Sequence, residues 1–125
     1  MQFSEKLPLH CPPEDASSAV GRIYRFVRQD PPSRKDMQSW EEEGRNSGQG
    51  DPCQRCALSI LVDEGDIASA RAAVPVFRKR KVAVATMLAA HGCIKQTGNS
   101  AWHHSLWLER SIVETVHTMF QVVRI

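Results

Sequence analysis

The sequence predicts an α+β domain, with about three helices packed on one mostly antiparallel or mixed sheet of five to six strands. Two observations support this fold class. Short apolar runs alternate with stretches at helical spacing, in the order strand, helix, strand, helix, three strands, helix, strand. The chain has 125 residues, of which 42% are hydrophobic and 24% are charged, and these values are typical of one folded domain.

The first 20 residues are expected to form an irregular N-terminal arm, because prolines and a polar cluster interrupt any apolar periodicity. The domain itself then comprises residues 21–125. Its first strand is predicted at residues 22–28, which are rich in β-branched and aromatic side chains. Both faces of this strand carry apolar groups, so both should be at least half covered.

A short helix is predicted after this strand. Pro31 ends the strand, since proline cannot donate to a β-ladder. Ser33 and Asp36 have the spacing of a capping box, and Gly44 is well placed to end the helix. The composition of residues 45–52, rich in Gly, Asn and Ser, predicts a flexible loop.

The middle of the chain contains the clearest strand signal. Residues 56–62 form a nearly continuous apolar run, which predicts a central strand. Asp66 is expected to cap a helix over residues 66–74, which Pro75 ends. Residues 82–88 alternate like a strand but are also alanine-rich enough for a helix, and we favour the strand.

The last third is predicted to complete the sheet. Residues 93–97 and 102–108 should be antiparallel neighbours joined by a tight turn at residues 98–99. A capping-box pattern starts at Ser111 and predicts a helix. Residues 121–125 then form a final edge strand.

The N-terminal sequence lacks the apolar run of a signal peptide, and no later window is apolar enough for a membrane span. We therefore expect a cytoplasmic protein with no membrane partner. Cytosolic thiols are kept reduced, so the four cysteines are expected as free thiols or metal ligands, with disulfides as the less favoured alternative: Cys11, Cys53, Cys56 and Cys93. The net charge of +2 is too small for a dedicated nucleic-acid binder.

Cys53 and Cys56 form a C-x-x-C motif before a predicted strand. Such a pair can bind zinc or form a redox couple. A structural zinc site needs two more ligands, and His91 with Cys93 is the second half that the sequence offers. A thioredoxin-like role fits less well, because that motif starts a helix. The simpler interpretation is two small buried or loop thiols, so no cofactor is expected apart from this zinc alternative.

Residues 100–107 contain two of the three tryptophans and two of the five histidines. Neighbouring residues of a strand point to opposite faces, so His103 and His104 cannot both serve one site in a regular strand. His104 lies on the more apolar face and is expected to be a core histidine. His103 shares its face with Trp107 and is the better candidate for contact with a ligand.

Arg25 lies between two apolar side chains of the first predicted strand. A buried guanidinium there needs a carboxylate, phosphate or carbonyl partner, so Arg25 is a candidate anion-binding residue, with a structural role as the alternative. A strand arginine followed by Ser59 on a later strand resembles, over these few residues, the ADP-ribosyltransferase-like arrangement. No catalytic glutamate motif accompanies the pair, and we do not assign the chain to that family.

Arg78, Lys79, Arg80 and Lys81 form a dense positive cluster that is able to meet phosphates. Since no aromatic residues are interleaved with it, a solvated edge that discourages aggregation between sheets is the better interpretation. Nucleic-acid binding through this cluster is only the third-ranked hypothesis.

The sequence contains no P-loop, dinucleotide-binding glycine fingerprint, G-x-S-x-G or H-E-x-x-H motif, so it names no activity. The leading hypothesis is a non-catalytic binding or interaction protein that forms homodimers and binds a small molecule or a protein partner. Its expected ligand contacts are Arg25, Trp102, His103 and Trp107. The alternative is an enzyme that uses His103 or His104 as general acid or base, with Arg25 holding an anionic substrate.

Overall fold

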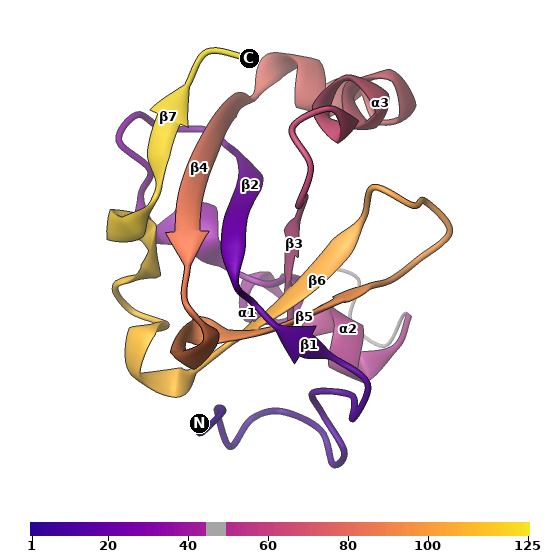
Figure 1. Ribbon diagram of the computed structural model, residues 1–125, viewed down its shortest axis with the longest axis vertical. Coiled ribbons are helices and arrows are strands. Elements are labelled where there is room, and N and C mark those ends of the chain that lie inside the picture. The colour runs from indigo at the N-terminus through magenta and orange to yellow at the C-terminus, as the bar shows by residue number, and fades with distance from the viewer. Residues whose placement is uncertain (45–49) are drawn as a thin grey trace.

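The computed structural model describes residues 1–44 and 50–125, which form an α+β domain with two antiparallel sheets (Figure 1). The strands are β1 (Ser17–Ser18), β2 (Gly21–Val27), β3 (Leu58–Ile60), β4 (Lys81–Met87), β5 (Gly92–Gln96), β6 (His104–Leu108) and β7 (Gln121–Val123). The α-helices are α1 (Trp40–Glu43), α2 (Pro52–Arg55) and α3 (Asp66–Ala73). The 3-10 helices are η1 (Arg34–Met37), η2 (Pro75–Lys79), η3 (Ala89–His91), η4 (Arg110–Ile112) and η5 (Val116–Met119).

The strands form two sheets rather than the single sheet that the sequence predicts. The larger sheet has the order β1-β5-β6-β3, the smaller one has the order β2-β4-β7, and all neighbouring strands are antiparallel. Instead of continuing into a meander with β5, β4 pairs along its whole length with β2. Two facing sheets cover each other's apolar faces, which one open sheet cannot do. Buried side chains of both sheets accordingly meet in one core cluster, among them Ile23, Ala85, Leu58 and Leu106.

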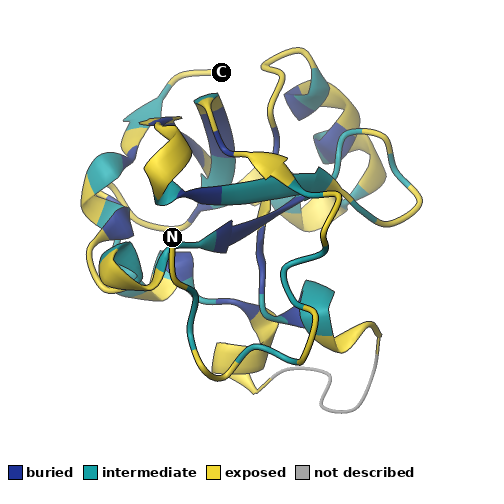
Figure 2. Ribbon diagram, turned by 60° about the horizontal axis from the view of Figure 1, so that its bottom comes forward, coloured by how far each residue is buried: buried dark blue, intermediate teal, exposed yellow. Residues whose placement is uncertain are grey.

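The burial pattern shows the same arrangement. Buried residues follow the strands through the centre of the molecule, whereas the arm and the helix surfaces are largely exposed (Figure 2). None of the helices in the described part of the chain has the length and apolar character needed to cross a membrane.

β3 is shorter than predicted and lies at the edge of its sheet, not at the centre. Its first two predicted residues, Cys56 and Ala57, form the end of the turn that follows α2, and Cys56 is the C-cap of that helix. At the start of α2, Asp51 accepts the N–H of Cys53 and Pro52 occupies the first helical position. Beyond the strand, Leu61 forms an isolated antiparallel bridge with Tyr24 of β2. The segment of β3 and Leu61 therefore connects the two sheets, with Leu58, Ile60 and Leu61 buried.

The predicted helix between the first two long strands is split into two turns. Asp36 accepts the N–H of Ser33 at 2.9 Å, as the predicted capping box requires, but this turn is η1. A second capping box, formed by Ser39 and Glu42, starts α1. Gly44 ends α1 with a left-handed φ of 70°, as predicted.

β4, β7 and α3 confirm the strand and helix predictions for their segments, although Gly65 rather than Asp66 is the N-cap of α3. The predicted helix from Ser111 is wrong: this segment forms η4 and η5. The carboxylate of Glu109, not the Ser111 side chain, caps the first turn by accepting the Ser111 N–H at 2.8 Å. The segment is rich in β-branched residues, which lowers its helix propensity.

The N-terminal arm contains several turns and bends, and its strand β1 pairs with β5. The expectation of four free or metal-bound cysteines is wrong, because Cys11 and Cys53 form a disulfide whose Cα atoms are 5.5 Å apart. The arm folds back against α2, which brings together two residues that lie 42 positions apart. Of the predicted flexible loop at 45–52, residues 45–49 lie outside the described residues, Asp51 is the N-cap of α2, and Pro52 is its first residue.

Candidate functional site

β3 and β6 bring Ser59 and His103 to the same face of the larger sheet. Ser59 lies opposite Ser105 in the antiparallel register, and residues paired in this way share a face. His103 precedes Ser105 by two positions and points to that face too. Leu58 and Leu106 point to the other face, into the core. The Ser59 and His103 side chains therefore lie on the face turned away from the core.

The two side chains are within hydrogen-bonding distance. Nε2 of His103 lies 3.0 Å from Oγ of Ser59, and Ser59 is exposed to solvent. The other ring nitrogen, Nδ1, lies 3.2 Å from the carbonyl oxygen of Thr97. A neutral imidazole with Nδ1 donating to this carbonyl leaves Nε2 as an acceptor for the Ser59 proton. The hydroxyl of Ser59, the imidazole base and the carbonyl that orients the base are thus connected by successive hydrogen bonds.

The β5–β6 hairpin holds the imidazole in place. The N–H of Thr97 donates to the carbonyl of His103 at 3.1 Å, so the backbones are paired beyond the end of the strands. Oγ1 of Thr97 lies 3.0 Å from Nδ1 of His103 and 2.8 Å from Oγ of the buried Ser105. Ser59, His103, Thr97 and Ser105 therefore form one continuous network, which we call the hydroxyl–imidazole network.

Burial keeps the imidazole neutral. It lowers the pKa of His103 below its ordinary value of 6.5, and the neighbouring His104 acts in the same direction. The hydrogen bond with Thr97 opposes this shift but does not cancel it. At neutral pH His103 is consequently available as a proton acceptor, which is the form a general base needs.

Arg25 reaches Ser59 from the second sheet, but through the backbone. Its Nη1 donates to the carbonyl of Ser59 at 2.8 Å, Nε donates to the carbonyl of Asp36 at 2.8 Å, and Nη2 donates to the carbonyl of Gln38 at 3.4 Å. Burial lowers the pKa of Arg25 to about 10, so the guanidinium stays charged at neutral pH. Carbonyl partners, one of the predicted options, thus engage all three guanidinium nitrogens and make Arg25 a link between β2, β3 and the segment before α1.

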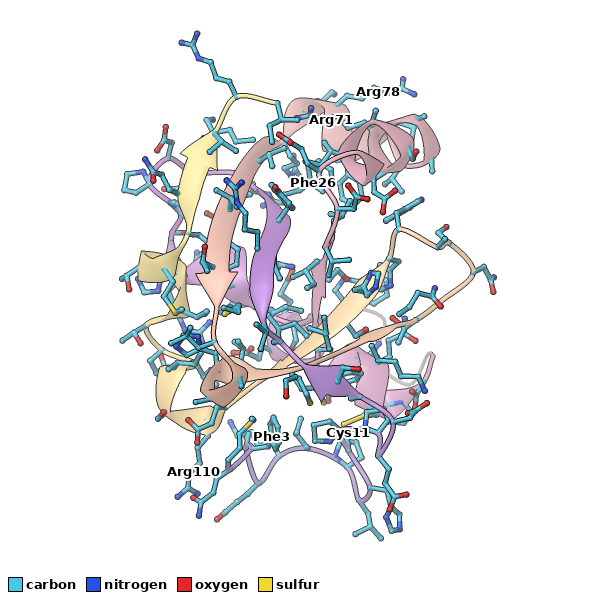
Figure 3. The ribbon with its side chains drawn as sticks, in the orientation of Figure 1. Phe3, Cys11, Phe26, Arg71, Arg78 and Arg110 are labelled. Carbon is cyan, nitrogen blue, oxygen red and sulfur yellow. A yellow bond between two sulfur atoms is a disulfide. The ribbon has the colours of Figure 1, made fainter. Side chains whose placement is uncertain are left out.

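A row of half-buried rings extends from the network along the smaller sheet. Trp102 contacts His103 edge to face, with ring centroids 6.0 Å apart, and Phe77 in the same way at 6.4 Å. Phe77 stacks on Phe26 at 4.2 Å, and the guanidinium of Arg71 lies 5.6 Å from the centroid of the Phe26 ring. Figure 3 shows Phe26 and Arg71 close to α3. This aromatic row places an apolar surface directly beside the base.

The structure does not bring Trp107 to this place. Trp107 is 2% exposed, and its Nε1 donates to the carbonyl of Cys53 in α2 at 3.0 Å. Its ring faces the same side of the sheet as His103 but is covered by α2 and the arm. Of the four predicted ligand contacts, His103 and Arg25 contact Ser59, Trp102 contacts His103, and Trp107 lies apart.

His104 is separated from His103, as the strand geometry predicts. It lies opposite Ile60 in the register and so points to the other face of the sheet. Its Nδ1 atom is buried and has no hydrogen-bond partner in the described part of the chain. His104 therefore does not contribute to the hydroxyl–imidazole network.

The predicted zinc site at Cys53, Cys56, His91 and Cys93 is not formed. The sulfur of Cys53 is bonded to Cys11, and Nδ1 of His91 accepts the N–H of Leu88 at 2.9 Å. Within residues 1–44 and 50–125, no three His, Cys, Asp or Glu side chains gather in a way that could hold a metal ion.

Part of the basic run at residues 78–81 makes hydrogen bonds within the fold. Arg78 donates to the carbonyl of Arg71 in α3 at 3.1 Å, and Lys81 donates to the carbonyl of Arg28 at 3.3 Å. Arg78 thereby interacts with the last turn of α3, where a cation is favourable. Two of the four predicted phosphate contacts are therefore engaged with backbone carbonyls.

Sequence reasoning noted Ser59 only in the resemblance to the ADP-ribosyltransferase-like arrangement, not as a partner of His103, and it missed Thr97. Ser59 is the one hydroxyl in an otherwise apolar run, and a polar residue that alternates with buried ones is exposed on the solvent face. This signal was available in the sequence. Thr97 carries no comparable signal, because its role depends on the hairpin register that aligns it with His103.

Comparison with protein-family models, with curated proteins and with solved structures finds no match for this chain. The functional argument therefore depends on the geometry of the site.

Proposed function

We propose that this protein is a small enzyme that uses Ser59 as a nucleophile and His103 as its general base, in a hydrolysis or acyl-transfer reaction. The observation that carries the proposal is the 3.0 Å contact between Nε2 of His103 and the exposed Oγ of Ser59, with Nδ1 held by Thr97. A nucleophile, its base and an orienting group are the arrangement that activates a serine hydroxyl.

The reaction would proceed in two steps. Oγ of Ser59 attacks the acyl carbon of an ester or a related substrate while its proton passes to Nε2 of His103. The imidazolium is stabilised by its Nδ1 hydrogen bond with Thr97, and it then returns the proton to the leaving group. Water or another acceptor then attacks the acyl-Ser59 intermediate while His103 takes up its proton. This step releases the acyl group, and His103 returns the proton to Oγ of Ser59.

Two neighbouring features support this role. The guanidinium of Arg25 donates to the backbone carbonyl of Ser59 and so holds in place the strand residue that carries the nucleophile. Trp102 offers an apolar surface beside His103 for the non-reacting part of a substrate. Arg25 is thus a positioning residue rather than the predicted holder of an anionic substrate.

The proposal is tested by labelling the purified protein with a fluorophosphonate probe, which reacts with activated serines, and by mapping the labelled residue. We expect Ser59 to be labelled and Ser59→Ala to abolish the label. We expect His103→Gln to slow labelling by roughly a hundredfold or more, the usual contribution of a general base. Hydrolysis of p-nitrophenyl acetate provides a second readout.

The matched control is Ser69→Ala. Ser69 is an exposed serine of α3 with no histidine beside it, so this variant should label like the unchanged protein. Failure of Ser59 to react, or equal labelling rates in His103→Gln and the unchanged protein, would contradict the proposal.

The cytoplasmic location, the homodimer and the protein partner remain predictions. The Cys11–Cys53 disulfide is more typical of oxidising compartments than of the cytosol, so it favours a location other than the one the sequence predicts.

A further inference from the structure

We propose that Cys11, Cys53 and Cys56 form an internal thiol–disulfide exchange site, in which Cys56 displaces Cys11 from Cys53 and thereby loosens the N-terminal arm from a groove of which the arm forms one wall. This inference does not rest on the serine–histidine chemistry. It combines three observations: a disulfide, a free thiol one helical turn away, and a groove lined by that thiol and by the arm.

The first step of the argument is the geometry of α2. Cys53 and Cys56 lie three residues apart, and the N–H of Cys56 donates to the carbonyl of Cys53 at 3.2 Å, so both belong to one helical turn. Helix geometry places such residues about 5 Å apart at Cα. This separation falls within the range of roughly 4.4–6.8 Å that disulfides span. A Cys53–Cys56 bond therefore needs only side-chain rotation and a small local adjustment.

The second step is the groove. Its volume is about 970 Å³, and Cys56 lines it. Residues 4–7 of the arm form one wall, and its apolar lining is completed by Met37, Leu58, Leu106, Trp107 and Leu108. β3 begins opposite Leu106, so the next two residues of β6, Trp107 and Leu108, lie beyond the β3 pairing and line this groove. The Cys56 thiol and residues 4–7 of the arm therefore border the same groove.

The third step is how the arm is attached. The carbonyl of Gln2 accepts the N–H of Arg110 at 2.8 Å, and Cys11 is bonded to Cys53. Between these two anchors, the described hydrogen bonds of residues 3–10 are internal to the arm. Figure 3 shows Phe3 and Arg110 where the arm meets the body, and Cys11 farther along it. Beyond Cys11 the arm is held by the ion pair of Asp15 with Lys95 and by the pairing of β1 with β5. Breaking the bond to Cys11 thus frees the stretch between Gln2 and Asp15 from its attachment to α2.

The exchange balances without an external oxidant or reductant. The Cys56 thiolate attacks the sulfur of Cys53, the Cys53–Cys56 bond forms, and the Cys11–Cys53 bond breaks with its electron pair leaving on Cys11. Cys11 then takes up the proton that Cys56 had lost. One disulfide and one thiol are present before and after the step.

The surroundings of Cys56 hold this reaction back at neutral pH. Burial raises the pKa of the Cys56 thiol, and the carboxylates of Glu41, Glu42 and Asp51 act in the same direction, whereas Arg55 opposes them. On the arm, Glu5 and Lys6 also border the groove. Because the thiolate is the attacking species, exchange should accelerate as the pH rises toward this pKa.

The test is disulfide mapping by mass spectrometry on the whole chain. Cys11→Ser is incubated with oxidised glutathione, and we expect it to form the Cys53–Cys56 bond. The protein with all its cysteines is incubated at alkaline pH without reductant and then alkylated. We expect a fraction of molecules in which Cys11 is alkylated and Cys53 is bonded to Cys56.

Two variants make the test specific. Cys56→Ser should keep Cys11 unalkylated, whereas Cys93→Ser, which removes the other free thiol, should behave like the unchanged protein. Trypsin should cleave after Lys6 roughly tenfold faster in oxidised Cys11→Ser than in the unchanged protein, because the arm has lost its anchor. The proposal is overturned if Cys11→Ser forms no Cys53–Cys56 bond, if Cys11 is alkylated equally in Cys56→Ser, or if cleavage after Lys6 does not change.

Discussion

Nε2 of His103 lies 3.0 Å from Oγ of Ser59, although 44 positions separate the two residues in the chain. The contact depends on the pairing of β3, which contributes three residues to its sheet, with β6. A slip of one residue in this register would turn Ser59 toward the core and Leu58 toward solvent. The burial of Leu58 and Ile60 therefore fixes the position of the serine between them.

The pH dependence of Ser59 reactivity should report the titration of His103. The pKa of His103 is lowered by burial, so the rate of fluorophosphonate labelling should rise with pH through a midpoint below 6.5 and be level at neutral pH. His103→Gln should lose this step. A labelling rate that shows no step in the acid range, or the same step in His103→Gln, contradicts the assignment of His103 as the base.

The free energy of unfolding should also depend on the titration of His103. His103 has a lower pKa in the folded than in the unfolded chain, so between the two values the unfolded chain binds more protons. The free energy of unfolding should therefore fall as the pH drops below about 6.5 and stop falling beneath the folded pKa. Urea unfolding at a series of pH values measures this, and His103→Gln should show a shallower loss. His10→Gln, a change in the exposed arm, is the control and should leave the loss intact.

Arg25→Lys should destabilise the fold. A lysine keeps the charge but cannot donate to three carbonyls at once, so the carbonyls of Ser59, Asp36 and Gln38 lose their shared donor. We expect a loss of about 2–4 kcal/mol in the free energy of unfolding. Arg22→Lys, at an exposed position of the same strand, should change it by less than about 0.5 kcal/mol. Equal effects of the two substitutions would show that Arg25 does not link the sheets.

Much of the local structure was predictable, because it depends on neighbours in the sequence. The strand at Arg25, the capping box at Ser33 and the left-handed stop at Gly44 follow from apolar alternation, side-chain chemistry and glycine's freedom at positive φ. The division into two sheets was not predictable, since both β2 and β5 offer antiparallel partners of suitable length for β4. Only the packing of the complete core decides between them.

The site was predictable in part. Alternation along a strand separates His103 from His104, and a strand arginine requires polar partners. The partners themselves come from distant segments: Thr97 through the hairpin register and Ser59 through β3. Trp107 is of a residue type that is common in ligand sites, but α2 covers it. The Cys11–Cys53 bond helps to hold α2 in this position, and it joins residues that lie 42 positions apart.

Loss of the Cys11–Cys53 bond should lower stability measurably. To prevent the alternative bond within α2, Cys11→Ser is made in a Cys56→Ser background and compared with Cys56→Ser alone. The bond closes a long loop, and we expect its removal to cost about 2–4 kcal/mol in the free energy of unfolding. Denaturant unfolding under non-reducing conditions measures the difference. A difference that persists unchanged in the presence of dithiothreitol would show that the serine substitution, and not the bond, is responsible.

Gly92→Ala should disturb both the fold and the proposed site. Gly92 is buried at the start of β5, and a Cβ there would nearly overlap the carbonyl oxygen of Trp107 in β6. Because the obstructing atom belongs to the backbone, it can move only if the two strands separate, and we expect a loss of about 2–3 kcal/mol. Gly65→Ala is the matched control, since its Cβ would meet only the Asp63 side chain at 3.4 Å, and it should change stability by less than about 1 kcal/mol.

The β5–β6 hairpin also carries the imidazole, so the two effects should be coupled. If Gly92→Ala separates the strands, Thr97 loses its place beneath His103, and labelling of Ser59 should slow even under conditions in which the variant is fully folded. Far-UV circular dichroism establishes the folded fraction, and labelling is measured on the same sample. Unchanged labelling in a folded but destabilised variant would mean that the register near Thr97 does not position the base.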